Sequence, residues 1–143
     1  MRRMVLLLTA TLLLGPAVSR GDERPANAAP QRLTVHLAEY RFEPSRIAFN
    51  AGQAVELTLI NDGTVLHEFV TEALKDLDVD LDVGGVLTEA LGIAEIEIPP
   101  RATVVLRFTP EHPGEFRVLC AATRPKNHQK EGMTAALVFR SPS

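Results

Sequence analysis

The segment from Val118 to Met133 constrains this chain more than any other, because it joins the single cysteine to two further metal-binding residue types. Seven residues separate Cys120 from His128, and four more separate that histidine from Met133. Upstream, the sequence NDGTVLHEF follows an apolar alternating run and supplies His67. One thiolate, two imidazoles and a thioether are the ligand set of a mononuclear blue-copper site, with a His2Cys plane and a weak axial Met. The sequence therefore predicts a fold that brings these four side chains to one point.

Residues 1–19 have the composition of a secretory signal peptide. Two arginines near the start precede the apolar run Met4–Leu14, and Ala17-Val18-Ser19 has the small-x-small pattern of a cleavage site. Ala26-Asn27-Ala28 fits the same rule, so cleavage as late as residue 28 is an alternative. The apolar run is too short to span a bilayer comfortably. We therefore expect a periplasmic or otherwise exported protein that meets the membrane only through this segment, before cleavage.

Export makes the cysteine count informative. Disulfides are common in oxidising compartments, but one cysteine cannot form an internal disulfide. Burial of an inert thiol, pairing between molecules and metal binding are the three alternatives, and the nearby His128 and Met133 favour metal binding. The other two methionines, Met1 and Met4, leave with the signal peptide. Met133 is then the only methionine of the mature chain, which strengthens its claim to be the axial ligand.

An apolar pattern with period two begins at Arg32 and predicts an all-β domain. Leu33, Val35 and Leu37 alternate with polar or small residues, as a half-buried strand requires. Short strands separated by Gly and Pro turns, with little helix, predict an antiparallel Greek-key β-sandwich. Before this domain, residues 20–31 are rich in Pro, Ala and charge and are expected to form a flexible lead. The expected strands are 33–37, 47–49, 55–60, 94–98, 102–108, 115–120 and 134–140.

The 143 residues fit a single domain, assigned to residues 32–143, with one unusual segment at 71–92. Four aspartates alternate with apolar residues from Asp76 to Asp82, and Gly84-Gly85 ends the run. The positions of Gly and Glu that a calcium-binding EF-hand loop requires are absent. We expect a solvated acidic strand face in a variable insertion, with a docking patch for a basic partner as the alternative. Leu87 to Leu91 could form a helical turn or two.

The two other histidines have simpler explanations than metal binding. His36 alternates within the first expected strand and is predicted to be exposed or at a sheet edge. His112 lies between Glu111 and Pro113-Gly114, which is typical of a turn. Either could replace His128 as a ligand if the long loop after Cys120 carried that residue away.

Taken together, these motifs resemble those of the cupredoxins, the family of plastocyanin, azurin and pseudoazurin. The resemblance covers roughly Leu33 to Phe139 and has two parts. The first part comprises Phe42-Glu43-Pro44, Gly52, the apolar strand 55–59, Asn61 and His67-Glu68-Phe69. The second comprises Pro113-Gly114-Glu115-Phe116, Cys120, His128 and Gly132-Met133.

The resemblance implies a Greek-key sandwich and one type 1 copper ion bound by His67, Cys120, His128 and Met133. It also implies that the histidine of the Cys-to-Met loop faces solvent and passes electrons. One departure concerns this loop, because many members place two to four residues between Cys and this histidine, whereas seven stand here. A longer loop can displace His128 or tilt the copper plane.

Two functions compete. The first is an electron carrier that cycles Cu(II)/Cu(I) with a redox partner protein of unknown identity and turns over no small-molecule substrate. The alternative is copper handling, meaning buffering, delivery or resistance, which a looser site would favour. We do not expect an enzyme: four histidines are too few for a multicopper oxidase, and one cysteine is too few for a binuclear copper centre. A Cys-His nucleophile pair would leave Met133 and His67 without a role. A net charge of −3 and an ordinary composition also argue against nucleic-acid binding.

The charge pattern offers two surfaces for a redox partner. Arg124, Lys126 and Lys130 form a basic collar around His128, which would favour an acidic partner. The face from Asp76 to Asp82 would favour a basic one. The two surfaces cannot both be the docking site for one partner. For each surface, charge that is simply solvated is the simpler interpretation.

Overall fold

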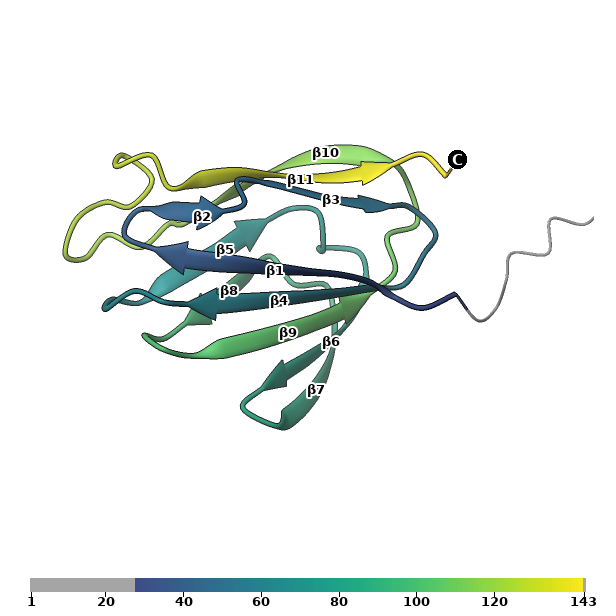
Figure 1. Ribbon diagram of the computed structural model, residues 1–143, viewed down its shortest axis with the longest axis horizontal. Coiled ribbons are helices and arrows are strands. Elements are labelled where there is room, and N and C mark those ends of the chain that lie inside the picture. Colours follow the sequence, from purple (N-terminus) through teal and green to yellow (C-terminus); the bar gives the residue numbers. More distant parts are fainter. Residues whose placement is uncertain (1–27, 143) are drawn as a thin grey trace, which may run out of the picture.

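The computed structural model describes residues 28–142 as a two-layer β-sandwich (Figure 1). The predicted signal peptide and most of the lead lie outside the described residues. Among the described residues there is no helix, and therefore none long and apolar enough to cross a membrane. The strands are β1 (Gln31–Ala38), β2 (Arg41–Glu43), β3 (Arg46–Asn50), β4 (Val55–Asn61), β5 (His67–Thr71), β6 (Asp78–Val83), β7 (Val86–Leu91), β8 (Glu95–Ile98), β9 (Thr103–Phe108), β10 (Gly114–Leu119) and β11 (Thr134–Arg140).

Two sheets form the layers. One has the order β2-β1-β4-β9-β6-β7, and the other has the order β3-β11-β10-β5-β8. Most neighbouring strands are antiparallel, as predicted, but β1 with β4 and β3 with β11 are parallel. The parallel pairs arise because β2 and β3, which follow one another in the chain, belong to different sheets. The sheets are therefore mixed, within the predicted sandwich architecture.

Alternating side chains from both sheets form the core. In β4 the side chains of Val55, Leu57 and Leu59 are buried, while those between them are partly exposed. Leu57 stands opposite Leu106 of β9 in the same layer. This is the pattern expected when one face of each sheet packs against the other sheet. The period-two apolar pattern thus places the core correctly.

The acidic segment forms a hairpin at the edge of its sheet. β6 and β7 pair from Asp78 opposite Leu91 to Val83 opposite Val86, and Gly84-Gly85 makes the turn with positive φ at both residues. The possibility of a helical turn over residues 87–91 is wrong, because hydrogen bonding to β6 holds them as a strand. Asp76, Asp78 and Asp80 are exposed and Asp82 is partly exposed, as expected. Val79, whose side chain lies on the other face of β6, is buried.

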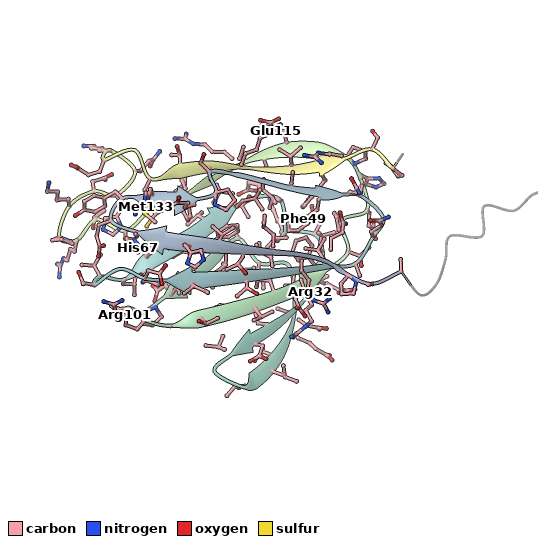
Figure 2. The ribbon with its side chains drawn as sticks, viewed as in Figure 1. Arg32, Phe49, His67, Arg101, Glu115 and Met133 are labelled. Carbon is pink, nitrogen blue, oxygen red and sulfur yellow. The ribbon has the colours of Figure 1, made fainter. Side chains whose placement is uncertain are left out.

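One end of the sandwich gathers the predicted ligands. Figure 2 shows His67 and Met133 near the same end of the molecule, where the loop between β10 and β11 also lies. Phe49, in the middle of the core, lies well away from this end. The adjacent strands β10 and β11 hold the two ends of this loop, so its conformation is constrained by the sheet on both sides.

Candidate metal centre

The loop that follows β10 carries Cys120 and His128 and is closed by its own backbone. The N–H of Cys120 donates to the carbonyl of Met133 (3.2 Å), and the N–H of Met133 donates to the carbonyl of His128 (3.0 Å). The N–H of His128 donates to the carbonyl of Ala122 (2.9 Å). The seven intervening residues therefore do not carry His128 away. They form a compact loop that places His128 beside Cys120.

His67 reaches the same point from the neighbouring strand. It begins β5 and stands opposite Ile98 of β8, and β5 also pairs with β10. The buried side chain of Asn61 orients the loop before it. Its amide donates to the carbonyls of Val65 (2.9 Å) and Ile98 (2.8 Å), and its oxygen accepts from the N–H of Gly63 (2.9 Å). This one side chain satisfies three backbone groups and ties the loop to the strand beside it.

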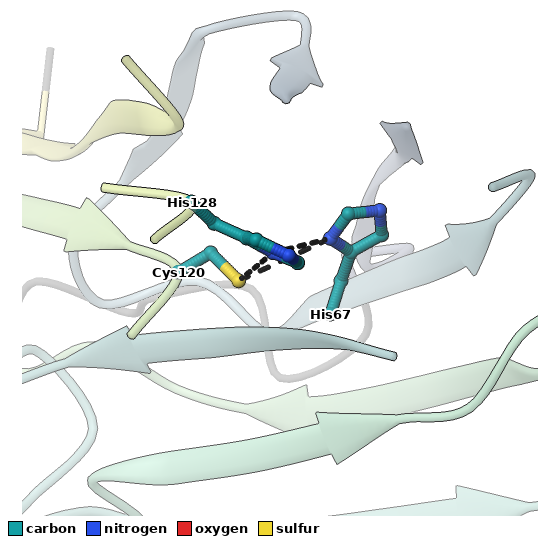
Figure 3. Close-up of side chains that lie close together, drawn as sticks. All are labelled: His67, Cys120 and His128. Carbon is teal, nitrogen blue, oxygen red and sulfur yellow. Dashed lines mark hydrogen bonds between the residues drawn. The ribbon is translucent and has the colours of Figure 1, made fainter. Parts of the chain in front are cut away.

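Three donor atoms converge in the interior (Figure 3). The Nδ1 atoms of His67 and His128 are 3.1 Å apart, and Cys120 Sγ lies 3.2 Å from His128 Nδ1 and 4.0 Å from His67 Nδ1. A point in the plane of this triangle lies about 2 Å from all three atoms, which is the length of a bond between a transition metal and an imidazole nitrogen. The donors therefore fit one metal ion of that size.

The Nε2 atoms of the two histidines, which lie away from the donor cluster, have different surroundings. His128 Nε2 lies 3.0 Å from the carbonyl of Arg124, so Nε2 carries the proton in that contact and Nδ1 presents its lone pair to the site. Orientation of a ligating histidine by a carbonyl is the usual outer-shell arrangement. His67 Nε2 is the one buried side-chain nitrogen or oxygen in residues 28–142 that has no hydrogen-bond partner.

Burial sets the protonation of the donors. Removal from water raises the pKa of the Cys120 thiol, against hydrogen bonds from the backbone of Glu68 and Ala122 that lower it. The N–H of Glu68 donates to Cys120 Sγ over 3.2 Å. Burial also lowers the pKa of His67, and nearby His128 lowers it further. The imidazole is thus kept neutral, whereas the thiol must lose its proton to bind a metal, so metal binding releases a proton.

His128 is completely buried, which corrects the expectation that it faces solvent. The ring of Tyr40 lies edge-on against it with a centroid distance of 4.8 Å and an interplanar angle of 62°. The Nζ of Lys126 sits over the Tyr40 ring, 6.0 Å from its centroid. The family resemblance could not predict this cover, because Tyr40 belongs to the turn between β1 and β2, far away in the sequence.

Met133 is buried at the same end of the sandwich, directly before β11. Its backbone joins those of Cys120 and His128, as described above. Its role as axial ligand stays a prediction from the ligand pattern. His36 and His112 do not join the cluster: His36 is exposed and contacts Asp62 through Nδ1 (2.7 Å), and His112 is exposed in a bend. Neither replaces His128.

The donor set is that of a type 1 copper site. Thiolate with two imidazoles is a soft combination that suits copper, and the N–H bonded to the sulfur is the kind of contact that tunes such a site. The cluster is also separate from the open pocket of about 550 Å3 beside β6, which is lined by residues such as Asp78, Asp80 and Arg107. The arrangement can hold one ion away from bulk water.

Comparison with solved structures confirms the fold. Auracyanin from Roseiflexus castenholzii matches with a TM-score of 0.54 at 17% identity, over 81% of this chain and 100% of the other. A multicopper oxidase from Campylobacter jejuni matches with a TM-score of 0.58 at 14% identity, over 82% of this chain and 31% of the other. A copper nitrite reductase from Nitrosomonas europaea matches with a TM-score of 0.59 at 13% identity, over 82% and 52%. The chain thus spans about a third of the length of the oxidase, and about half that of the reductase.

No curated protein matches the sequence at a significant level. A family match is nevertheless clear, to the cupredoxin-like domain over residues 4–130. That range includes His67, Cys120 and His128 and ends shortly before Met133. With most of the chain matched, a mixed-sheet sandwich and a buried His2Cys cluster at one end, the protein belongs to the cupredoxin family.

Proposed function

We propose that the protein is an exported electron carrier whose single type 1 copper ion is held by His67, Cys120 and His128, with Met133 as the axial ligand. The observation that carries this proposal is the complete burial of all three donor side chains at one point. A copper ion bound there supplies a one-electron Cu(II)/Cu(I) couple. The protein's part is to hold both imidazoles and the sulfur in one arrangement and to exclude water.

Burial argues for electron exchange rather than catalysis. A substrate needs an open position at the metal, but 0% of each donor residue's surface is exposed. Of the four histidines in the sequence, the two outside the cluster are exposed and separate, so they offer no second copper site of the multicopper kind. Electrons, unlike substrates, can cross the thin layer formed by Tyr40. This supports a carrier that turns over no small molecule, although several structural neighbours are enzymes.

The decisive experiment is the visible spectrum of protein expressed with copper. The proposal expects a blue oxidised form that is bleached by reductant and recovers on oxidation, because the thiolate-to-copper interaction absorbs strongly. Cys120→Ser should abolish the colour, and His128→Ala should abolish or strongly shift it. His112→Ala is the matched control, since His112 is an exposed histidine that touches none of the donors. A colourless copper-loaded protein would contradict the proposal.

Copper handling is the second candidate, favoured by the exposure of most of the loop between Cys120 and His128. The two candidates differ in how fast the ion leaves. A carrier should keep Cu(I) in the presence of a competing chelator and show a reversible redox couple. A handling protein should lose Cu(I) within the mixing time of the same experiment. The backbone bonds that close the loop support slow loss.

The redox partner that we propose is an acidic protein that docks on the basic collar. Arg124, Lys126 and Lys130 are exposed on the loop that covers His128, and only Lys126 among them has an ion pair in the described residues, with Glu131 (3.8 Å). The acidic strand β6 belongs to the other sheet, where it lies next to the edge strand β7. Lys126→Glu with Lys130→Glu should slow oxidation by ferricyanide, an anion, whereas Asp80→Lys in β6 should change it little. The reverse order of effects would assign docking to β6.

A further inference from the structure

We propose that the turn between β1 and β2, Glu39-Tyr40, is the cover and clamp of the metal site. Tyr40 closes His128 off from solvent, and Glu39 holds the loop that leads to His67. Tyr40 thereby keeps small-molecule ligands away from the ion. This inference deepens the proposed function and rests on it only for that last consequence. The cover itself can be tested in the metal-free protein.

The contact with Tyr40 covers one side of the buried His128 ring. Within its own loop the carbonyl of Arg124 lies 3.0 Å from His128 Nε2, but the residues from Thr123 to Lys126 are themselves exposed. The Tyr40 ring stands edge-on to the imidazole with a centroid distance of 4.8 Å and is itself only partly buried. It therefore separates the imidazole from solvent. Lys126 sits over the same ring, so the collar and the cover are in contact.

Glu39 makes three hydrogen bonds to the segment before His67. Its Oε1 accepts from the N–H of Thr64 (2.6 Å), the hydroxyl of Thr64 (3.1 Å) and the N–H of Val65 (3.2 Å). These bonds, led by the backbone N–H of Thr64, act together with Glu39's own backbone N–H to lower the pKa of the Glu39 carboxyl to about 2. A Cβ on Gly63 would lie 2.7 Å from the same oxygen, so the carboxylate packs directly against the loop backbone.

The two adjacent residues thus contact both histidine-bearing segments. His67 and His128 come from different parts of the chain, and their Nδ1 atoms are 3.1 Å apart. One short turn that holds the loop before the first and packs on the ring of the second fixes their separation. A turn anchored by β1 on one side and β2 on the other is well placed to do this.

Carbethoxylation of histidines by diethyl pyrocarbonate, followed residue by residue with peptide mass spectrometry, tests the cover without copper. In the wild-type protein His36 and His112 should react, because they are exposed, and His67 and His128 should be protected. Tyr40→Ala should raise the rate at His128 at least tenfold and leave His36 and His112 unchanged. Tyr40→Phe keeps the ring and should restore protection.

An unchanged rate at His128 in Tyr40→Ala would overturn the cover, because some other group would then enclose the ring. Rescue by Phe separates ring packing from a role of the hydroxyl. If Tyr40→Ala loses its strand signal in circular dichroism, Tyr40→Val takes its place with the same two outcomes. Valine keeps an apolar side chain in the turn but is too short to cover the imidazole.

Glu39→Ala tests the clamp in the same assay. The rate at His67 should rise several-fold, and Glu39→Gln should give a smaller rise because its amide oxygen can still accept one or two of the bonds. Glu43→Gln is the matched control, since Glu43 is an exposed carboxylate in β2 whose partner is Arg41. A rate at His67 that is the same in Glu39→Ala and Glu43→Gln would overturn the clamp.

Azide added to the copper-loaded protein tests the claim that Tyr40 keeps small-molecule ligands away from the ion. The wild-type and Tyr40→Phe spectra should not change, whereas the Tyr40→Ala spectrum should shift as azide reaches the ion. Absence of a shift in Tyr40→Ala would overturn the claim that Tyr40 excludes ligands. If no blue copper form is obtained at all, the proposed function fails, but the histidine rates in the metal-free protein still decide whether the turn is the cover.

Discussion

The loop that carries the metal ligands and the β6–β7 hairpin are opposites in structure and in packing. The loop from Cys120 to Met133 has no regular secondary structure, yet its three predicted ligands are wholly buried and joined by backbone hydrogen bonds. The hairpin is fully regular, yet Val86, Leu87 and Leu91 are among its exposed apolar residues. Burial in this molecule therefore follows tertiary contacts rather than regular backbone, and the irregular end is the one suited to a precise metal geometry.

Loss of a donor should have the largest effect. Cys120→Ala or His128→Ala removes one corner of the donor triangle, and we expect copper affinity to fall by more than about 100-fold, the upper range for changes in groups that merely support a ligand. Competition with a chromophoric Cu(I) chelator measures this. Leu87→Ala in the hairpin is the control and should leave affinity unchanged. Equal affinities in the Cys120→Ala and Leu87→Ala proteins would break the assignment of the metal to this end.

Asn61→Ala should be the most destabilising of the changes near the site that touch no ligand. It removes three hydrogen bonds and leaves the carbonyl of Val65 and the N–H of Gly63 without the partner that Asn61 provides. At about 1–3 kcal/mol for each stranded group, we expect a loss of roughly 2–5 kcal/mol in the free energy of unfolding. Urea unfolding measures it. A loss below about 1 kcal/mol would show that the loop before His67 is held by other contacts.

Acid should remove the stabilisation that Glu39 gives to the site end of the molecule. The pKa of Glu39 is lowered from 4.5 to about 2, first by the backbone N–H of Thr64, then by its own backbone N–H, with smaller contributions from the Thr64 hydroxyl and the N–H of Val65. The contribution of this group to stability is therefore complete above about pH 4.5 and is lost as the pH falls toward 2. In Glu39→Gln, the free energy of unfolding should depend less on pH across that window. Urea unfolding from pH 6 to pH 3 checks this, and the same slope in wild type and Glu39→Gln would contradict it.

The exposed end of the hairpin should tolerate substitution best. Leu91 is 79% exposed, so Leu91→Ser should change the free energy of unfolding by no more than about 0.5 kcal/mol. Leu57→Ala in the core is the matched comparison and should cost about 2–5 kcal/mol. The same urea measurements give both values. A large loss of unfolding free energy for Leu91→Ser would mean that the Leu91 side chain is covered in solution. The hairpin would then not differ from the ligand loop in burial.

The class of fold and the candidate ligands can be predicted from local sequence patterns. Period-two patterns such as Val55, Leu57 and Leu59 depend only on which side of a strand faces the core, so they can be recognised in a short stretch of sequence. The combination of one cysteine with His128, Met133 and His67 limits the metal chemistry for the same reason, because residue type alone decides which metals can bind. The local pattern does not predict the short strands β2 and β5 or the extended β7, since their conformation depends on the strands they pair with.

The enclosure of the site, by contrast, depends on contacts between segments that are distant in the chain. The parallel pairing of β1 with β4 and of β3 with β11, the contact of Tyr40 with His128 and the bonds of Glu39 to the loop before His67 all join segments that are distant in the chain. No local pattern marks such partners, because each contact depends on where the sheets place two segments rather than on the composition of either one. The burial of His128 belongs to this class, and it is the feature from which a closed, electron-exchanging site is inferred.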